Sequence, residues 1–204
     1  MSDDLLLLCG VASGPLFTAV YLLTGALRPD YNSLRHPVSS LSIGRTGWVQ
    51  VVNFLGCAVL LSSAFAVGLW REGPSRWGAV LIGLWAVGLL GAGIFRADPV
   101  RGYPPGSPDR IERPTRVGTL HDAFSMAAFL GLIAACFVYA PHGSAGWTAY
   151  SIASGVLFAG AMGWSSAAFS GSPRMAGFGG LLQRVALVVG CGWLTVLALR
   201  TLYP

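Results

Sequence analysis

Two groups of side chains in this sequence have residue types suited to chemistry, and both lie beside long apolar runs. The first is the stretch RPDYNSLRHPVSSLSIGRTGWVQ at 28–50, which holds three arginines, an aspartate and a histidine. The second is formed by Asp98 and by the neighbouring pair His121 and Asp122. Histidine beside carboxylates suits general acid–base catalysis, and arginine suits bidentate binding of phosphate or carboxylate. These groups predict either a reactive site or a site for an anionic ligand.

The composition decides the environment in which these groups must lie. Of the 204 residues, 54% are hydrophobic and 10% are charged, whereas charged residues make up about 25% of a typical soluble domain. Too few polar residues are present to cover a soluble domain, so the sequence predicts an integral membrane protein. All 13 basic residues are arginine and the net charge is +5. They are scattered among the connections rather than arranged as a stripe, so no nucleic-acid partner is expected.

Six apolar runs are long enough to cross a hydrocarbon core, which takes about 20 residues. None shows the alternating pattern of a membrane β-barrel, and helices satisfy their own backbone polar groups in lipid. The acidic start MSDDLLLLCG predicts that the first run is a retained span rather than a cleaved signal. The fold class predicted is an all-α polytopic membrane protein, with residues 1–204 forming a single six-helix transmembrane domain. Its spans are expected at about 5–27, 48–70, 77–95, 120–140, 147–169 and 181–202.

The connections between these spans are unequal. REGPSR and PHGSAG are short and lie on one side, while the long segments 28–47 and 96–119 and the stretch SGSPRMAGFGG lie on the other. Arginine follows the same division, with positions 71, 76 and 200 on the short side and positions 28, 35, 45, 96, 101, 110, 113, 116, 174 and 184 on the long side. The positive-inside rule places the long loops in the cytoplasm. Arginines that serve a binding site would bias that count.

The polar residues on the long-loop side are expected to converge into one pocket. The residues predicted for acid–base chemistry are His121, Asp98, Asp122 and His36, and those predicted for ligand binding are Arg28, Arg35, Arg101, Tyr103, Arg184 and Asn53. Gln50, Ser125, Ser165 and Ser166 could form its floor. A guanidinium is always charged and is costly to place at depth. Arg184 therefore indicates a carboxylate partner, a water-filled cavity or an anionic ligand.

Several of these residues have a structural alternative. Arg28 and Arg184 stand near the ends of spans and could extend to the interface. Thr119 and Asp122 fit a capping box at the start of the fourth span. A metal site built from the four acid–base candidates is chemically possible, but their spacing matches no recognised ligand motif. Neither a metal nor another cofactor is therefore predicted. No GxSxG motif marks a serine nucleophile.

Four segments of the chain, in order, resemble the domain of unknown function 998 family of bacterial and archaeal multi-pass membrane proteins. They are RPDYNSLRHPVSSLSIGRTGWVQVVNF, FRADPVRGYPPG, GTLHDAFS and GLLQRVAL. The resemblance covers almost the whole chain, with Arg96 as a departure from the usual small or polar residue. It implies that the family's recurrent polar set includes Arg28, Arg35, His36, Asp98, Gly102, His121, Asp122 and Arg184. It implies no reaction.

Two classes of function follow from this pattern. In the first, the pocket binds an anionic lipid-like or amphiphilic ligand at one membrane face, and whether acid–base hydrolysis follows is left open. Its partners would be membrane lipids or a small anionic amphiphile. The predicted location is a cell membrane, which the chain crosses several times. In the alternative, the protein is a non-catalytic transporter, or an interaction or structural component, and the same charges only pin the long loops.

Overall fold

The structure, a computed structural model, describes residues 2–170 and 177–204. Within these ranges the chain is helical and contains no β-strand. The helices are α1 (Asp3–Leu27), α2 (Trp48–Leu55), α3 (Ser63–Glu72), α4 (Arg76–Ile94), α5 (Arg116–Tyr139), α6 (Ala145–Phe169) and α7 (Gly179–Leu202). A short 3-10 helix spans Val38–Ser42, and a π-helical segment, Gly56–Ser62, joins α2 to α3. Arg174 and most of the stretch before α7 lie outside the described residues.

Six helices are long and apolar enough to cross a membrane, because α2, the π-helical segment and α3 form one continuous span over Trp48–Glu72. The predicted six-span, all-α class is therefore confirmed. The start of the fourth span differs from the prediction. Thr115, not Thr119, is the N-cap of α5, and its Oγ1 accepts a hydrogen bond from Gly118 N at 2.9 Å. The predicted capping box of Thr119 and Asp122 is wrong, because the helix begins one turn earlier.

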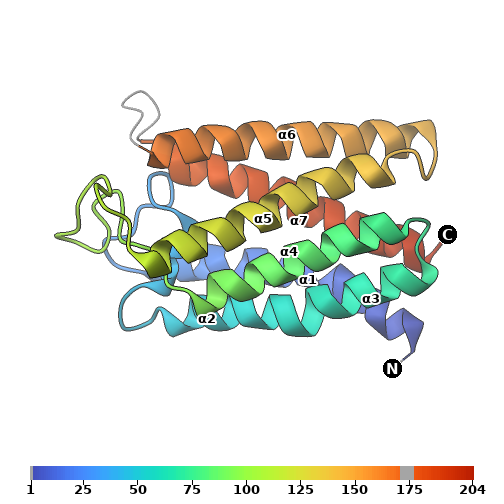
Figure 1. Cartoon of the computed structure of the whole chain (residues 1–204), viewed down its shortest axis with the longest axis horizontal. Helices are drawn as coiled ribbons and strands as arrows, with labels where there is room; N and C mark the ends of the chain where they lie inside the picture. Colours follow the sequence, from blue (N-terminus) through green and yellow to red (C-terminus); the bar gives the residue numbers. More distant parts are fainter. Residues whose placement is uncertain (1, 171–176) are drawn as a thin grey trace.

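The six spans close into a ring. Around it, α1 packs against α7, α7 against α6, α6 against α5, α5 against α4, α4 against α3, and α3 against α1. The long connections gather at one end of the bundle, and the short connections and both chain ends lie at the other (Figure 1). This end with the long connections is called the long-loop end below.

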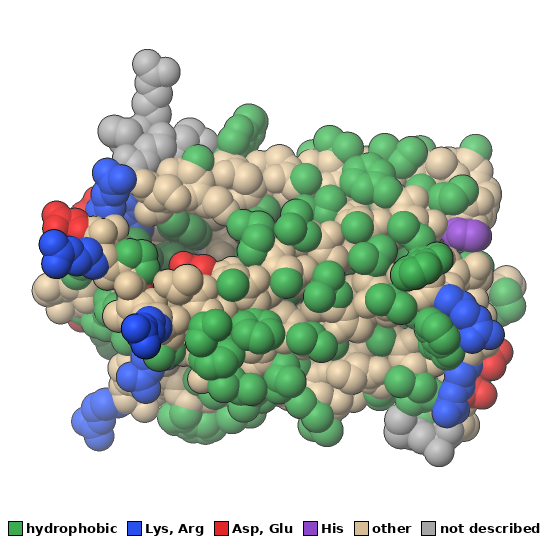
Figure 2. All heavy atoms as spheres, viewed as in Figure 1, with side chains coloured by type: hydrophobic (Ala, Val, Ile, Leu, Met, Phe, Trp, Pro, Cys, Tyr) green, Lys and Arg blue, Asp and Glu red, His purple; other side chains and the backbone are tan. Residues whose placement is uncertain are grey.

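Burial and surface composition agree with a membrane location. Large side chains such as Trp85, Trp193, Tyr139 and Phe65 are buried inside the bundle. The outer face carries exposed apolar side chains along the spans, and the charged side chains collect at the two ends (Figure 2). Because lipid rather than water is the favourable neighbour of such a face, the chain is a multi-pass membrane protein.

Candidate functional site

A cavity of about 470 Å³ lies toward the long-loop end of the bundle. Figure 2 shows a hollow there between α5 and α6, with an acidic side chain at its rim. The segment 96–115 contributes Ala97, Asp98, Val100, Arg110, Ile111 and Pro114 to the lining, so part of this connection roofs the cavity. Apolar side chains from several helices line the rest, including Phe17, Phe54, Trp85, Leu89, Phe129, Met162 and Leu187. The cavity thus combines an apolar interior with polar groups near one membrane face.

His121 is the buried titratable group of this lining. Its ring is 2% exposed, and Nδ1 lies 2.9 Å from the carbonyl oxygen of Phe95 and 3.2 Å from that of Ala92. Carbonyl oxygens only accept hydrogen bonds, so Nδ1 carries the proton. Its N–H donates a hydrogen bond to carbonyl oxygens at the C-terminal end of α4. In the neutral ring, Nε2 therefore holds the lone pair. No described residue forms a hydrogen bond with Nε2, so this lone pair is available to accept a proton.

Asp98 has a structural task as well as a place in the cavity wall. One carboxylate oxygen accepts a hydrogen bond from Thr115 N at 2.8 Å, and the other accepts one from Thr115 Oγ1 at 2.7 Å. Thr115 in turn caps α5 through Gly118 N. The carboxylate also lies at the positive end of the helix dipole of α5, where negative charge is favourable. Asp98 therefore ties the start of the segment 96–115 to Thr115, the N-cap of α5.

Asp122 and three serines supply the remaining polar groups predicted for the pocket. Asp122 is exposed and lines the cavity, and it makes no hydrogen bond with the described residues. Ser125 and Ser166 also line the cavity, and Ser165 donates to the Gly179 carbonyl at 2.8 Å. Asn53, predicted for ligand binding, donates to the Phe17 carbonyl at 3.1 Å and joins the second span to α1, while the floor candidate Gln50 is buried. Neither of these two lines the cavity.

The four arginines predicted for ligand binding lie next to this cavity rather than in its lining, and Arg184 is the most buried of those bonded to the segment 28–47. Its Nη1 donates to the carbonyl oxygens of Ser33 at 2.7 Å, Gly180 at 3.0 Å and His36 at 3.1 Å. Its Nη2 donates to the hydroxyl of Tyr31, which donates to the Pro37 carbonyl at 2.9 Å. Arg184 thus ties the segment 28–47 to the start of α7.

Arg28 performs a similar task within the same loop. Its Nη1 donates to the Ile43 carbonyl at 2.7 Å and to the Tyr103 hydroxyl at 3.3 Å, while Nη2 donates to Thr46 Oγ1. The donors of this guanidinium therefore hold the segment 28–47 and connect it with the segment 96–115.

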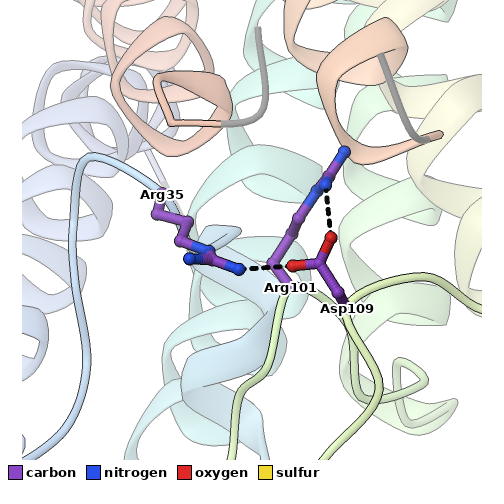
Figure 3. A network of polar contacts seen from close by, with 3 residues as sticks. All are labelled: Arg35, Arg101 and Asp109. Atoms are coloured by element: carbon purple, nitrogen blue, oxygen red, sulfur yellow. Dashed lines mark hydrogen bonds and ion pairs between the residues drawn. The ribbon is translucent and has the colours of Figure 1, made fainter. Parts of the chain in front are cut away.

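Arg35 and Arg101 share one carboxylate, that of Asp109 (Figure 3). Arg101 Nη1 lies 3.0 Å from Asp109 Oδ2, and Arg35 pairs with Oδ1 of the same group. This trio joins the two long loops at the surface of the long-loop end.

His36 and Tyr31 lie among these arginines, and burial and the nearby guanidinium groups shift the pKa of each side chain. Burial lowers the pKa of His36 below its ordinary value of 6.5, and the adjacent Arg35 guanidinium lowers it further. Asn32 N donates to His36 Nδ1 at 2.9 Å, which also requires that nitrogen to be unprotonated. Burial raises the pKa of Tyr31, against the opposing effect of Arg184.

The residues predicted for the site therefore fall into two neighbouring groups. Asp98, His121 and Asp122 line the cavity, while His36, Arg28, Arg35, Arg101, Tyr103 and Arg184 form a loop cluster beside it. Among the described residues, no group of three or more histidine, cysteine or acidic side chains could hold a metal ion.

Three contributors were missed by the sequence reasoning. Asp109 is the carboxylate partner of the buried Arg101, whereas Arg184, for which a carboxylate was one expected partner, bonds to backbone carbonyls. Gln183 lines the cavity and accepts a hydrogen bond from Val38 N at 2.7 Å. Thr115 is the N-cap of α5, one turn before Thr119, where the cap was predicted. The apolar lining had no sequence signal, because its residues look like any other buried face of a span.

The fold and this site define a class: a six-span helical membrane protein with a polar-rimmed cavity at one membrane face. More particularly, the chain belongs to the family described as Protein of unknown function (DUF998), whose model matches residues 11–200. No curated protein and no solved structure matches the chain.

Proposed function

We propose that this protein binds an anionic lipid-like or amphiphilic ligand in the cavity between α5 and α6, within a cell membrane. The observation that carries the proposal is a cavity of about 470 Å³ with an apolar interior, polar groups near its mouth and a hollow that opens on the side of the bundle (Figure 2). Its volume falls within the range of about 300–1,000 Å³ common for small-molecule sites. An acyl chain would lie among Phe17, Phe54 and Trp85, and Arg110 at the roof would meet a negative headgroup.

A cavity-filling substitution tests this binding. Ser125→Phe adds a ring to the cavity lining, whereas Ala123→Phe adds the same bulk to an exposed position on the same helix. Purified variants are titrated with a pyrene-labelled fatty acid, and co-purified lipid is measured by mass spectrometry. Ser125→Phe should weaken binding by at least about tenfold, since the ring displaces the apolar part of the ligand. Equal binding by Ser125→Phe and the wild type would contradict the proposal.

Acid–base hydrolysis of a bound ester would use His121. In that reaction Nε2 takes a proton from water as the water oxygen attacks the ester carbonyl, and the leaving alkoxide then takes the proton from Nε2. His121→Asn is the suitable variant, because the asparagine amide can still donate to the carbonyls of Ala92 and Phe95 while Nε2 is lost.

Turnover is measured with a fluorogenic medium-chain ester, alongside binding of the fatty-acid probe. If the protein is a hydrolase, His121→Asn lowers kcat by about a hundredfold or more with binding retained. Lack of turnover by the wild type, with binding present, leaves the second candidate, a non-catalytic transporter or structural component. The engagement of Asp98 by Thr115 favours that candidate, because both carboxylate oxygens already serve the start of α5.

A further inference from the structure

The trio of Arg35, Arg101 and Asp109 is unbalanced in both charge and hydrogen bonding. Two guanidinium groups share one carboxylate, so the trio carries net positive charge (Figure 3). The side chain of Arg101 is 2% exposed, whereas that of Asp109 is 58% exposed. A charge buried this completely is usually matched by partners that are buried with it. Here the only described carboxylate that it contacts is one that water also reaches.

Arg101 also has hydrogen-bonding capacity that the described residues do not use. Its Nη1 bonds to Asp109, but its buried Nε and Nη2 have no hydrogen-bond partner among them. Buried guanidinium donors without acceptors are costly, and planar N–H pairs of this kind match the oxygens of a phosphate group. The unused donors therefore indicate a ligand with more acceptor oxygens than one carboxylate offers.

The surroundings reinforce the positive field around this trio. Arg28 and Arg184 lie in the same loop cluster, and their guanidinium groups bond to carbonyl and hydroxyl oxygens rather than to carboxylates. His36, in contact with Tyr31 and Tyr103, stays neutral more readily than usual because burial and Arg35 both lower its pKa. An anion that reached Arg35 and Arg101 would thus meet positive charge with little opposing charge nearby.

We propose that Arg35 and Arg101 form a phosphate-binding site, and that the carboxylate of Asp109 occupies this site as an internal substitute. A phosphate group offers more acceptor oxygens than a carboxylate, so it bonds to both guanidinium groups and to the unused donors of Arg101 together. Asp109 is free to give way, because its side chain is largely exposed and belongs to the loop between Arg101 and Arg110.

Occupation of this site by phosphate has a consequence for the cavity. Backbone hydrogen bonds from Arg101 N to Asp109 O, at 3.0 Å, and from Gly102 N to Pro108 O, at 3.1 Å, close the loop that carries the carboxylate. The adjoining residues Val100 and Arg110 line the cavity. Release of Asp109 therefore loosens the roof of the cavity from the segment 28–47. The phosphate site itself does not depend on what the cavity binds.

Neutralising the internal carboxylate tests the proposal. Asp109→Asn removes the competing charge, and Asp30→Asn is its control, because Asp30 is an exposed residue of the other long loop and asparagine tolerates its φ of 59°. Inorganic phosphate is titrated against each protein in a neutral detergent, and affinity is followed by calorimetry and by the rise in Tm. Asp109→Asn should bind phosphate about tenfold more tightly than the wild type, and Asp30→Asn no more tightly.

A second variant keeps the test decisive if Asp109→Asn does not fold. Arg35→Gln changes a guanidinium that is 44% exposed, and it should weaken phosphate binding by about tenfold. The same proteins in nanodiscs with and without phosphatidylglycerol distinguish a lipid headgroup from free phosphate as the source. The proposal is overturned if neither phosphate source raises the Tm in a manner that depends on Arg35, or if Asp109→Asn folds and binds phosphate no more tightly than Asp30→Asn. Binding of the fatty-acid probe is measured separately, so the two proposals fail independently.

Discussion

At the scale of single residues, the two buried histidines of the long-loop end have opposite hydrogen-bonding roles at Nδ1. In His121 this nitrogen donates to carbonyl oxygens, whereas in His36 it accepts from Asn32 N. Both arrangements fit the neutral ring, but only protonation of His36 at Nδ1 would break an existing hydrogen bond. His36 therefore couples the pH to the fold of the segment 28–47.

This coupling has a definite sign. Because burial and Arg35 hold the folded-state pKa of His36 below 6.5, the unfolded chain binds more protons between the two pKa values. The contribution of neutral His36 to the stability of the folded protein is fully present above about pH 6.5 and is lost as the pH falls through the folded-state pKa. His36→Asn should flatten this part of the profile while keeping an acceptor for Asn32 N. Tm measured by tryptophan fluorescence from about pH 8 to about pH 5 checks this, and equal pH profiles for both proteins would refute it.

At the scale of elements, the start of α5 depends on a contact that only glycine permits. An added Cβ at Gly118 would overlap the Asp98 carboxylate, so Gly118→Ala should displace Asp98 from Thr115. We expect a loss of about 1–3 kcal/mol in the free energy of unfolding. Gly160→Ala is the matched control, because nothing lies within 4 Å of its added Cβ on α6, and it should be neutral or stabilise by up to about 1 kcal/mol. Equilibrium unfolding in detergent measures the free energy of unfolding of both variants. A change for Gly118→Ala no more destabilising than that for Gly160→Ala would contradict the prediction.

The elements also show how far the sequence could predict this molecule. The six spans follow from long apolar runs, because a membrane leaves few alternatives to a helix of about 20 residues. The helix start at Thr115 did not follow, because Thr115 and Thr119 look alike as candidate N-caps until Asp98 is placed beside one of them. Likewise, the sequence indicated that Arg184 needed partners, but backbone carbonyls from 33 and 36 carry no sequence signal. Contacts between distant loops depend on tertiary packing, which neither composition nor periodicity encodes.

At the scale of the whole molecule, the ends of the bundle differ in how they use arginine. At the short-loop end, Arg71 pairs with Asp3, while Arg76 and Arg200 stack on Trp70 and Trp147. At the long-loop end, four arginines are bonded within the loop cluster, so they serve the fold as well as topology. Five further arginines, at positions 45, 96, 110, 113 and 116, remain on that side among the described residues.

The orientation prediction is unchanged when the four arginines of the loop cluster are left out of the count. Five against three still favours the long-loop end as the cytoplasmic one under the positive-inside rule. Ser107→Cys places a thiol in the segment 96–115, and His142→Cys places one in the short connection between α5 and α6. In spheroplasts of a bacterial host, a membrane-impermeant maleimide should label His142→Cys at once and Ser107→Cys only after permeabilisation. The wild type controls for the native cysteines, three of which are buried. Immediate labelling of Ser107→Cys would invert the orientation and place the cavity mouth and the phosphate site on the outer face, where they would meet extracellular rather than cytoplasmic ligands.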